Sequence, residues 1–408
     1  MKKAIMMVML LLLSFLPREG MCSYSWANLA DFKGIDQFAI FLTGNFKFSN
    51  GEIKGRVAVK GDAYLNKFAI GKNARKTDYT LIVNGNLYAG GSGNNDGGNI
   101  YNGGVYAGSS ATIEKVTIHE SQSQLSSKGN ISLKNLSLPV NVKTEGNVTV
   151  DHFKLTGNID ANNDITVKYG NVDGNVNAGG DVTIQYARVE GDVNAAGNIN
   201  ISNASVGGNQ GYSYTPITVN SPFDFDSVNL SDIAKELYKD GTDIGITYGK
   251  IAINITDPGT YYFDISAADF AGNWGLFSIN APSGSTVVID IIDDPDDISL
   301  VNKDFQISGG ITTDDIIFNF MDEDGNLSID IKDSSPIFGS ILAPNGDIEL
   351  NNGGVEGSIM AVSLAPPVGL DSNSQIIGPP VPIPSSLFLL LSAAGLLFLV
   401  RRDVIVKM

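Results

Sequence analysis

The sequence predicts an all-β protein, a right-handed β-solenoid (β-helix) with 17-residue coils and one flanking α-helix. Two observations carry this prediction. Between positions 147 and 208 a strand-like pattern returns every 17 residues, whereas a repeat of two packed helices needs about 30 residues or more per unit. Within each unit apolar and polar residues alternate, and Val, Ile, Thr, Asn and Gly dominate, as they do in short strands joined by turns.

The repeat consists of four close units and a looser one upstream, which begin at Asn130, Asn147, Asp164, Asp181 and Asn198. The alternation predicts which side chains point into the coil, namely Val148, Val150, Leu155, Ile165, Val167, Val172, Val182, Ile184 and Val189. Each close unit also has a glycine at its tenth step, at Gly157, Gly174, Gly191 and Gly208. There we expect a corner that needs either a positive φ or a close approach to the next coil. Because one coil cannot bury its own apolar side, the coils must stack.

Composition and charge fit an exported β-protein and narrow its functions. Cys22 is the only cysteine in the chain and lies at the edge of the N-terminal signal, so we expect neither disulfides nor thiol chemistry in the mature protein. The formal net charge is −17 over 408 residues. Such an acidic balance argues against nucleic acid and anionic membranes as partners.

The order of the chain suggests seven regions. Residues 1–22 have the pattern of a signal peptide, because Lys2 and Lys3 precede an apolar run. The remaining regions are irregular N-terminal β-helix coils (34–125), the repeat coils (126–213), the flanking helix (222–241), C-terminal β-helix coils (243–366), a Pro-rich linker (367–384) and a C-terminal sorting or transmembrane segment (385–408).

The helical prediction depends on residues 226–241. Ile233, Leu237 and Tyr238 lie on one face of this segment, acidic residues stand near its start, and Gly241 follows its end. These are the positions that helix caps prefer. We expect the helix to pack along the side of the solenoid.

Two blocks of the sequence, residues 38–105 and 338–361, contain short strands that end in Gly-Asn or Asn-Gly turns. Both blocks resemble the choice-of-anchor A domain family of bacterial surface proteins, over about two-thirds of the mature chain. The second block also resembles the final coils of the ice-binding-protein β-helix. The resemblance implies a related β-helix and an adhesive role, and it brings no catalytic residues. The repeat coils between the blocks look like additional coils that are not part of the family motif.

The C-terminal tail resembles a PEP-CTERM sorting signal, in particular the Val-Pro-Leu-Pro-Ala variant that exosortases read. The matching residues are Val381, Pro382, Pro384, Arg401 and Arg402. Ile383 replaces the acidic residue of the namesake motif, which leaves the identity of the sorting enzyme open. The apolar stretch before the arginines is about 24 Å long as a helix, slightly short for a membrane core of about 30 Å. The resemblance implies an exosortase-type partner and a transient stay in the inner membrane; a permanent anchor is the alternative.

The sequence offers little catalytic machinery. His119 and His152 are the only histidines, and they fall in different coils without a matching acid partner at any phase of the repeat. A catalytic triad or a histidine metal centre is therefore not expected. The glycine-rich stretch 91–96 lacks the third glycine of a dinucleotide-binding loop. We predict that the protein is not an enzyme; a β-helix polysaccharide-active enzyme that uses paired carboxylates is the alternative.

Calcium is the one cofactor that the sequence leaves open. Asp322, Asp324 and Asn326 place oxygen ligands at alternating positions around a glycine, and residues 290–297 are rich in aspartate. Calcium takes about six to eight oxygens, and neither run completes a twelve-residue loop with a closing glutamate. Asp-Gly and Asp-Pro turns between strands explain both runs more simply.

The outward positions of the repeat form a polar column. It consists of Ser132, Thr149, Thr166, Thr183 and Asn200. Such a column either serves only to hydrogen-bond along the rod or binds a repetitive ligand such as a glycan or ice. Lys168, Gln185 and Tyr186 crowd the neighbouring positions, which disfavours ice.

Together these patterns predict an exported, non-catalytic protein of the cell surface or extracellular matrix with a structural or adhesive role. The expected partner is an extracellular polysaccharide or another surface ligand. Ice binding or glycan binding is the first alternative function, and a polysaccharide-active enzyme is the second.

Overall fold

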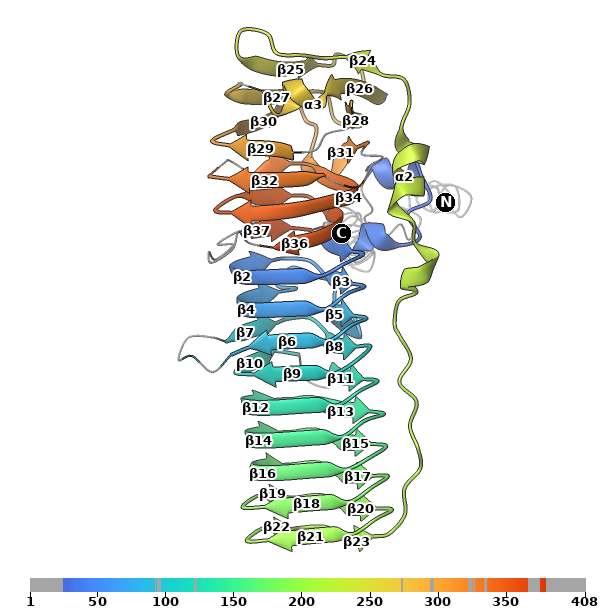
Figure 1. The fold of residues 1–408 in the computed structure, drawn as a ribbon, viewed down its shortest axis with the longest axis vertical. Helices are drawn as coiled ribbons and strands as arrows, with labels where there is room; N and C mark the ends of the chain where they lie inside the picture. The colour runs from blue at the N-terminus through green and yellow to red at the C-terminus, as the bar shows by residue number, and fades with distance from the viewer. Residues whose placement is uncertain are drawn as a thin grey trace, which may run out of the picture. The chain divides into compact units, whose positions relative to one another are not determined.

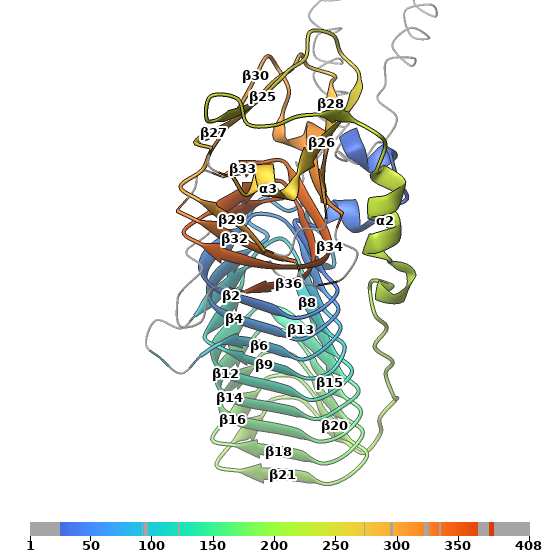
Figure 2. The same cartoon turned by 45° about the horizontal axis from the view of Figure 1, so that its top comes forward.

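The computed structural model describes residues 25–378 except residues 92, 94–96, 121–122, 273, 294–296, 322–324, 326, 334–335 and 366–374. The described residues form a rod of stacked β-coils, seen from the side in Figure 1 and tilted in Figure 2. A sheet of 34 strands winds around the axis of the rod, and a second sheet has three strands. All described strand pairs of the ladder coils are parallel. The prediction of an all-β solenoid is confirmed.

In the coils from residue 40 to residue 211, the strands form three sides. The first side, called the strap face, consists of β1 (Ile40–Leu42), β3 (Val57–Val59), β5 (Tyr79–Val83), β8 (Gly104–Ala107), β11 (Ser123–Ser127), β13 (Val140–Thr144), β15 (Ile159–Ala161), β17 (Val176–Ala178), β20 (Val193–Ala195) and β23 (Gln210–Gly211). The second side, the ladder face, consists of β2 (Phe46–Ile53), β4 (Ala63–Ile70), β6 (Leu87–Gly90), β9 (Ala111–Glu114), β12 (Ile131–Leu138), β14 (Val148–Leu155), β16 (Ile165–Val172), β18 (Val182–Gln185) and β21 (Ile199–Ser202). Its long strands turn a corner onto the third side, which they share with β7 (Gly98–Ile100), β10 (Val116–Ile118), β19 (Arg188–Val189) and β22 (Ser205–Val206).

The coils after residue 241 form the other part of the rod. Their strands in the large sheet are β24 (Thr242–Asp243), β26 (Thr260–Ser266), β28 (Thr286–Ile292), β29 (Asp297–Val301), β31 (Ile316–Phe320), β32 (Ser328–Lys332), β33 (Ile337–Phe338), β34 (Ser340–Asn351), β35 (Gly354–Glu356), β36 (Ile359–Ala365) and β37 (Gln375–Ile377). The three-stranded sheet contains β25 (Lys250–Asn254), β27 (Leu276–Asn280) and β30 (Asp304–Ser308). The helices among the described residues are α2 (Leu230–Leu237) and α3 (Ala267–Phe270), with 3-10 turns η1 (Ser25–Asn28), η2 (Ile35–Gln37), η3 (Phe225–Ser227) and η4 (Thr313–Asp315).

The 17-residue period of the sequence is the register of the sheet. Val148 pairs with Ile165, which pairs with Val182 one coil further on. All nine side chains predicted to point inward are buried. The coils between residues 63 and 131 are longer, since Ala63 pairs with Leu87, Leu87 with Ala111 and Ala111 with Ile131. This difference in coil length explains why the period fades upstream of residue 130.

The repeat glycines are required by close approach and not by a positive φ. A Cβ atom on Gly157 would lie 2.0 Å from the Val140 carbonyl oxygen, and one on Gly191 would lie 2.6 Å from the Gly174 oxygen. The left-handed backbone instead occurs at a different corner, at His152 and its equivalents one coil apart, with φ near 50°. Of the two reasons expected for the glycines, close packing of adjacent coils is the one that holds.

The coils are not stacked in the order of the sequence. Strand β36 pairs with β1, so that Ile359 lies beside Ile40 and Met360 beside Phe41. The chain therefore starts in the middle of the rod and winds to β23 at one end. Residues 212–229, called the strap, then return along the side, and after α2 the chain winds from the other end back to the middle (Figure 1).

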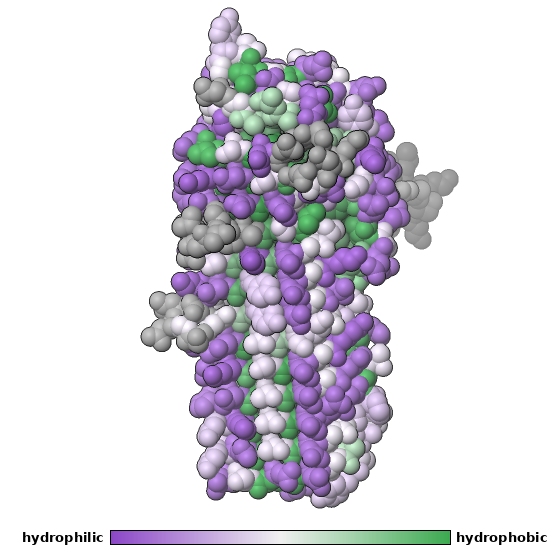
Figure 3. All heavy atoms as spheres, in the orientation of Figure 1, coloured by the Kyte–Doolittle hydropathy of each residue, from purple (hydrophilic) through white to green (hydrophobic). Residues whose placement is uncertain are grey.

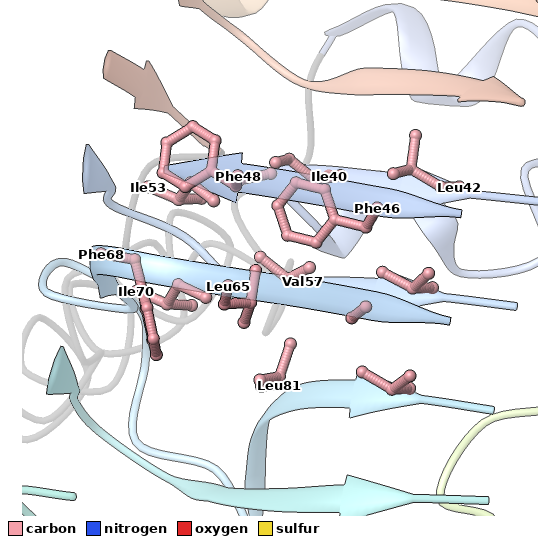
Figure 4. Packing of buried hydrophobic residues seen from close by; sticks show 14 of the residues in the cluster. Ile40, Leu42, Phe46, Phe48, Ile53, Val57, Leu65, Phe68, Ile70 and Leu81 are labelled. Atoms are coloured by element: carbon pink, nitrogen blue, oxygen red, sulfur yellow. The ribbon is translucent and has the colours of Figure 1, made fainter. Parts of the chain in front are cut away.

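The solenoid has two apolar cores. The first fills the inside of the coils, where side chains such as Phe46, Phe48 and Leu65 stack along the axis (Figure 4). The second lies outside the strap face, where Phe41 and Tyr106 point outward and are covered by the N-terminal turns, the strap and α2. Burying an apolar side chain of this size stabilises the fold by about 1.5–3 kcal/mol.

Helix α2 packs along the side of the solenoid as expected, on β31 and β34. These strands, together with β24, β26, β28 and β36, continue the strap face through the later coils. The helix is shorter than the segment 222–241. The side chain of Asn229 accepts hydrogen bonds from the first helical N–H groups, and Tyr238 leaves the helical conformation. Ile233 and Leu237 are buried against the sheet, and Tyr238 is half-buried. In the part of the chain that the structure describes, none of the helices has the length and apolar character to cross a membrane.

Candidate functional site

The predicted polar column exists on the ladder face. The register places Thr149 beside Thr166 and Thr166 beside Thr183 on neighbouring coils. Ser132 and Asn200 continue the column at its two ends. Thr149 is exposed, and the other two threonines are half-buried. The alternation of the strands, with valine or isoleucine on either side, turns these hydroxyl groups outward.

The same column extends beyond the repeat. Ser132 lies beside Thr112, Thr112 beside Tyr88, and Tyr88 beside Tyr64. The rings of Tyr64 and Tyr88 stack with their centroids 4.9 Å apart and an angle of 7° between their planes. The 17-residue period does not reveal this extension, because the coils that form it are longer than 17 residues.

A charged column lies next to the polar one, two residues further along each strand. Glu114 pairs with Lys134, Lys134 with Asp151, and Asp151 with Lys168, after which Gln185 follows. Opposite charges on adjacent strands attract each other. Figure 3 shows side chains of similar hydropathy gathered in vertical columns over this part of the rod.

An aromatic column lies at the corner where the ladder face meets the third side. This corner column consists of His152, Tyr169 and Tyr186. The rings of His152 and Tyr169 stack at 4.8 Å, and those of Tyr169 and Tyr186 at 5.3 Å with an angle of 5°. Tyr169 and Tyr186 are 48% and 56% exposed. All three residues adopt a left-handed backbone, which swings the rings out of the sheet.

A shallow hollow of about 700 Å³ lies beside these rings. Tyr169 and Tyr186 form one wall, and Asn171 and Arg188 line it from the third side. The Arg188 guanidinium is held by Glu190 through two contacts of 2.5 and 2.9 Å. The hollow therefore offers flat apolar rings next to fixed hydrogen-bonding groups, a combination that suits a ligand with both apolar and hydroxyl faces.

Most aspartate and asparagine side chains of the repeat have a structural task. Asp164 Oδ1 accepts a hydrogen bond from the backbone N–H of Asp181 at 2.8 Å, and Asp181 Oδ1 accepts one from Asn198 at 2.7 Å. A second such series follows the repeat glycines, where Asn158 Oδ1 accepts from the Asn175 N–H at 2.8 Å. These bonds satisfy backbone donors at the turns, so the acidic residues there do not indicate catalysis.

A comparison with known protein families identifies the family of this chain. The family model described as "Putative Ice-binding-like adhesive domain" matches residues 31–137 and 128–374, which together cover well over half of the chain. The chain belongs to this family. The match over residues 128–374 contains the repeat coils of this ice-binding-like adhesive domain, so the expectation that they are not part of the family motif is wrong.

The ice-binding-like adhesive domain is also similar to a solved structure, a crystal structure of an ice binding protein from an Antarctic bacterium, Flavobacteriaceae. The sequence identity is 13% and the TM-score is 0.20. The match covers 84% of this chain and 96% of the other. No curated protein matches the chain.

The two histidines of the adhesive domain lie in different coils, as expected, but one of them has an acidic partner. His152 Nδ1 lies 2.7 Å from Asp151 Oδ1, so the expectation that neither histidine meets an acid is wrong. The side chains of His152 and Asp151 both reach solvent at this corner of the rod. His119 stacks on Tyr101 at 4.2 Å and bonds to Asn99. Neither histidine therefore lies in a site that excludes water.

Several predicted site residues lie outside the described part of the chain. These are Asp322, Asp324 and Asn326 of the calcium prediction and Val381, Pro382, Pro384, Arg401 and Arg402 of the sorting signal. Among the described residues no group of three or more His, Cys, Asp or Glu side chains is placed to hold a metal. Asp290, the first residue of the aspartate-rich run, is buried in β28.

Proposed function

We propose that this domain is a non-catalytic adhesive module of the cell surface or extracellular matrix that binds polysaccharide along the ladder face and its corner column. The observation that carries the proposal is the exposed stack of His152, Tyr169 and Tyr186 beside the hollow with Asn171 and Arg188. The description of its family as adhesive supports the same role.

The geometry of the corner column suits a chain-like ligand. The rings repeat once per coil, at centroid spacings of 4.8 and 5.3 Å, and so form one continuous apolar strip. Rigid aromatic rings contribute binding area with little loss of side-chain entropy. Hydroxyl groups of a sugar would then meet the threonine column on one side and Asn171 and Arg188 on the other.

The flat surface favours many weak contacts over one deep pocket. Each coil presents a similar set of groups, and several copies on one cell would bind the same polymer together. Linked weak contacts can raise the overall affinity by about 10²–10⁴-fold. The net charge of −17 opposes strongly anionic polymers, so a neutral polysaccharide is the ligand class that we propose.

We predict that replacing both Tyr169 and Tyr186 by alanine weakens polysaccharide binding by about tenfold to a hundredfold, because exposed aromatic anchors dominate such interfaces. Binding is measured by affinity electrophoresis in gels that contain neutral polysaccharides. Tyr248→Ala is the matched control, since this tyrosine is 99% exposed and lies between β24 and β25 at the other end of the rod. Equal binding by the double variant and the unaltered chain would contradict the proposal.

Ice binding is the second candidate, because the description of the family refers to ice-binding proteins. The threonine column is regular enough to order water. However, the charged side chains of Lys134, Asp151 and Lys168 stand directly beside it. Thermal hysteresis with faceted ice crystals, abolished by Thr166→Tyr and unaffected by the tyrosine double variant, would favour ice over polysaccharide.

We also propose that an exosortase-type enzyme processes the tail that begins at Val381, after a transient stay of the chain in the inner membrane. The resemblance of residues 381–402 to PEP-CTERM signals supports this. We predict that mass spectrometry of the extracellular protein finds a C-terminus near Pro384. Recovery of only full-length, membrane-bound chain would instead indicate a permanent anchor.

A further inference from the structure

Four consecutive coils place a polar residue at the same outward position of the strap face. Asp243 lies beside Asp264, Asp264 beside Asp290, and Asp290 beside Asn319. Parallel neighbours of this kind are about 4.8 Å apart. In the coils that follow, the same position is occupied by the apolar side chains Leu342 and Met360, which belong to the second core.

Three of these four residues are buried beneath α2 and the segment after it. Asp290 and Asn319 have no exposed surface, and Asp264 is 7% exposed. Asn319 Nδ2 donates hydrogen bonds to Asp290 Oδ1 at 2.6 Å and to the carbonyl oxygen of Ala234 in α2 at 3.1 Å. The backbone N–H of Gly241 donates to Asp264 Oδ2 at 3.1 Å.

One oxygen of each of the three residues is left over. Asp264 Oδ1, Asp290 Oδ2 and Asn319 Oδ1 are buried and have no hydrogen-bond partner in the described part of the protein. Asp290 lies between the two other residues: its Oδ1 accepts the hydrogen bond from Asn319 on one neighbouring coil, and Asp264 lies beside it on the other neighbouring coil. Buried polar atoms are nearly always paired, and buried charges are paired or coordinate a metal.

Lys239 is the basic residue that acts on Asp290, because its backbone N–H and its charge both lower the pKa of that carboxyl. Its ammonium is exposed and donates to the Glu236 carbonyl oxygen at 3.2 Å, so it is not bonded to the buried carboxylates. Burial, together with the charge of Asp264, raises the pKa of Asp290 to about 7. Helix α2 ends here at Leu237, and the carboxyl end of a helix carries partial negative charge. The neighbouring buried carboxylates and the end of the helix favour a bound cation.

We propose that Asp264 and Asp290, oriented by Asn319, bind a hard divalent cation of the calcium class at the carboxyl end of α2. Two carboxylates and an amide oxygen are the ligands that such a cation prefers, and water or backbone carbonyls complete its shell. The ion would fasten α2 to three coils at once. The proposal uses none of Asp322, Asp324 and Asn326, and it is independent of polysaccharide binding on the ladder face.

The test uses the purified full chain after treatment with a chelator. Isothermal titration should show one calcium ion per chain, and calcium should raise the melting temperature by several degrees, because a ligand of the folded state stabilises it. Asp290→Asn and Asp264→Asn should each abolish the uptake and the shift, even where they change the starting stability. Asp243→Asn, an exposed member of the same column, and Asp324→Asn should leave both intact.

Three results would overturn the proposal. The unaltered chain could take up no calcium, or Asp290→Asn could bind it as well as the unaltered chain does. In the third result, a proton on Asp290 would stabilise the buried pair in place of the cation. Because the folded-state pKa of Asp290 is raised, a neutral Asp290 would make stability fall as the pH rises through about 7, whether calcium is present or not.

Discussion

Deletion of residues 164–180, one complete coil of the repeat, is expected to leave a folded rod that is one coil shorter. The register supports this, because Val148 pairs with Ile165 and Ile165 with Val182, so the deletion brings Val148 beside Val182. Asn147 Oδ1 would then accept the backbone N–H of Asp181 in place of that of Asp164. The strap becomes too long by about 4.8 Å, roughly one residue and a half, which a surface segment absorbs.

Deletion of residues 164–172 is the control, because it removes about half a coil and so shifts the following strands out of the 17-residue register. Strand positions alternate between the two faces, so a shift of this kind moves the apolar side chains of the following strands to the outside. We expect the variant to lose its cooperative thermal transition by circular dichroism, while the whole-coil deletion melts within a few degrees of the unaltered chain. Equal tolerance of both deletions would contradict the register.

Replacement of Phe41 by alanine is expected to lower the free energy of unfolding by about 3–5 kcal/mol, the usual cost of removing a buried phenylalanine. Phe41 is fully buried where the two windings of the chain meet, beside Met360 of β36. Its ring also contacts Phe223 and Phe225 of the strap, with centroids 5.7 and 5.9 Å away. The substitution therefore weakens both the junction and the strap.

Chemical denaturation followed by tryptophan fluorescence measures this loss, because Trp26 lies in the same core. Tyr169→Ala is the matched control. It also removes an aromatic ring, but one that is 48% exposed on the corner column, so we expect a loss below about 1 kcal/mol. Similar losses for both variants would show that the second core does not hold the two windings together.

The candidate site was predictable in part. The threonine column follows from the 17-residue period, because side chains at equal positions of successive coils must lie side by side. The same period contains His152, Tyr169 and Tyr186, yet on the sequence alone Tyr186 counted only as an obstacle to ice binding. The stacking of these rings depends on the left-handed backbone at the corner, which is unusual outside glycine and asparagine and has no clear signal in the sequence.

The sequence by itself determined the ladder: its strands, its register and the side chains that fill it. This was possible because each coil contacts mainly its neighbours, so a local pattern of alternation fixes both the strand and its partner. The period alone assigns Val148, Ile165 and Val182 to one inward column, and the three side chains form one.

Only the tertiary structure decided what lies on the outside of the strap face. An outward Phe41 beside an outward Met360 depends on β36 stacking against β1, more than 300 residues later in the chain. An outward Asp290 is buried only because α2 folds back over it. Alternation along a strand distinguishes its two sides, but it carries no information about which distant segment covers the outer one. That choice depends on contacts between parts of the chain that no local pattern connects.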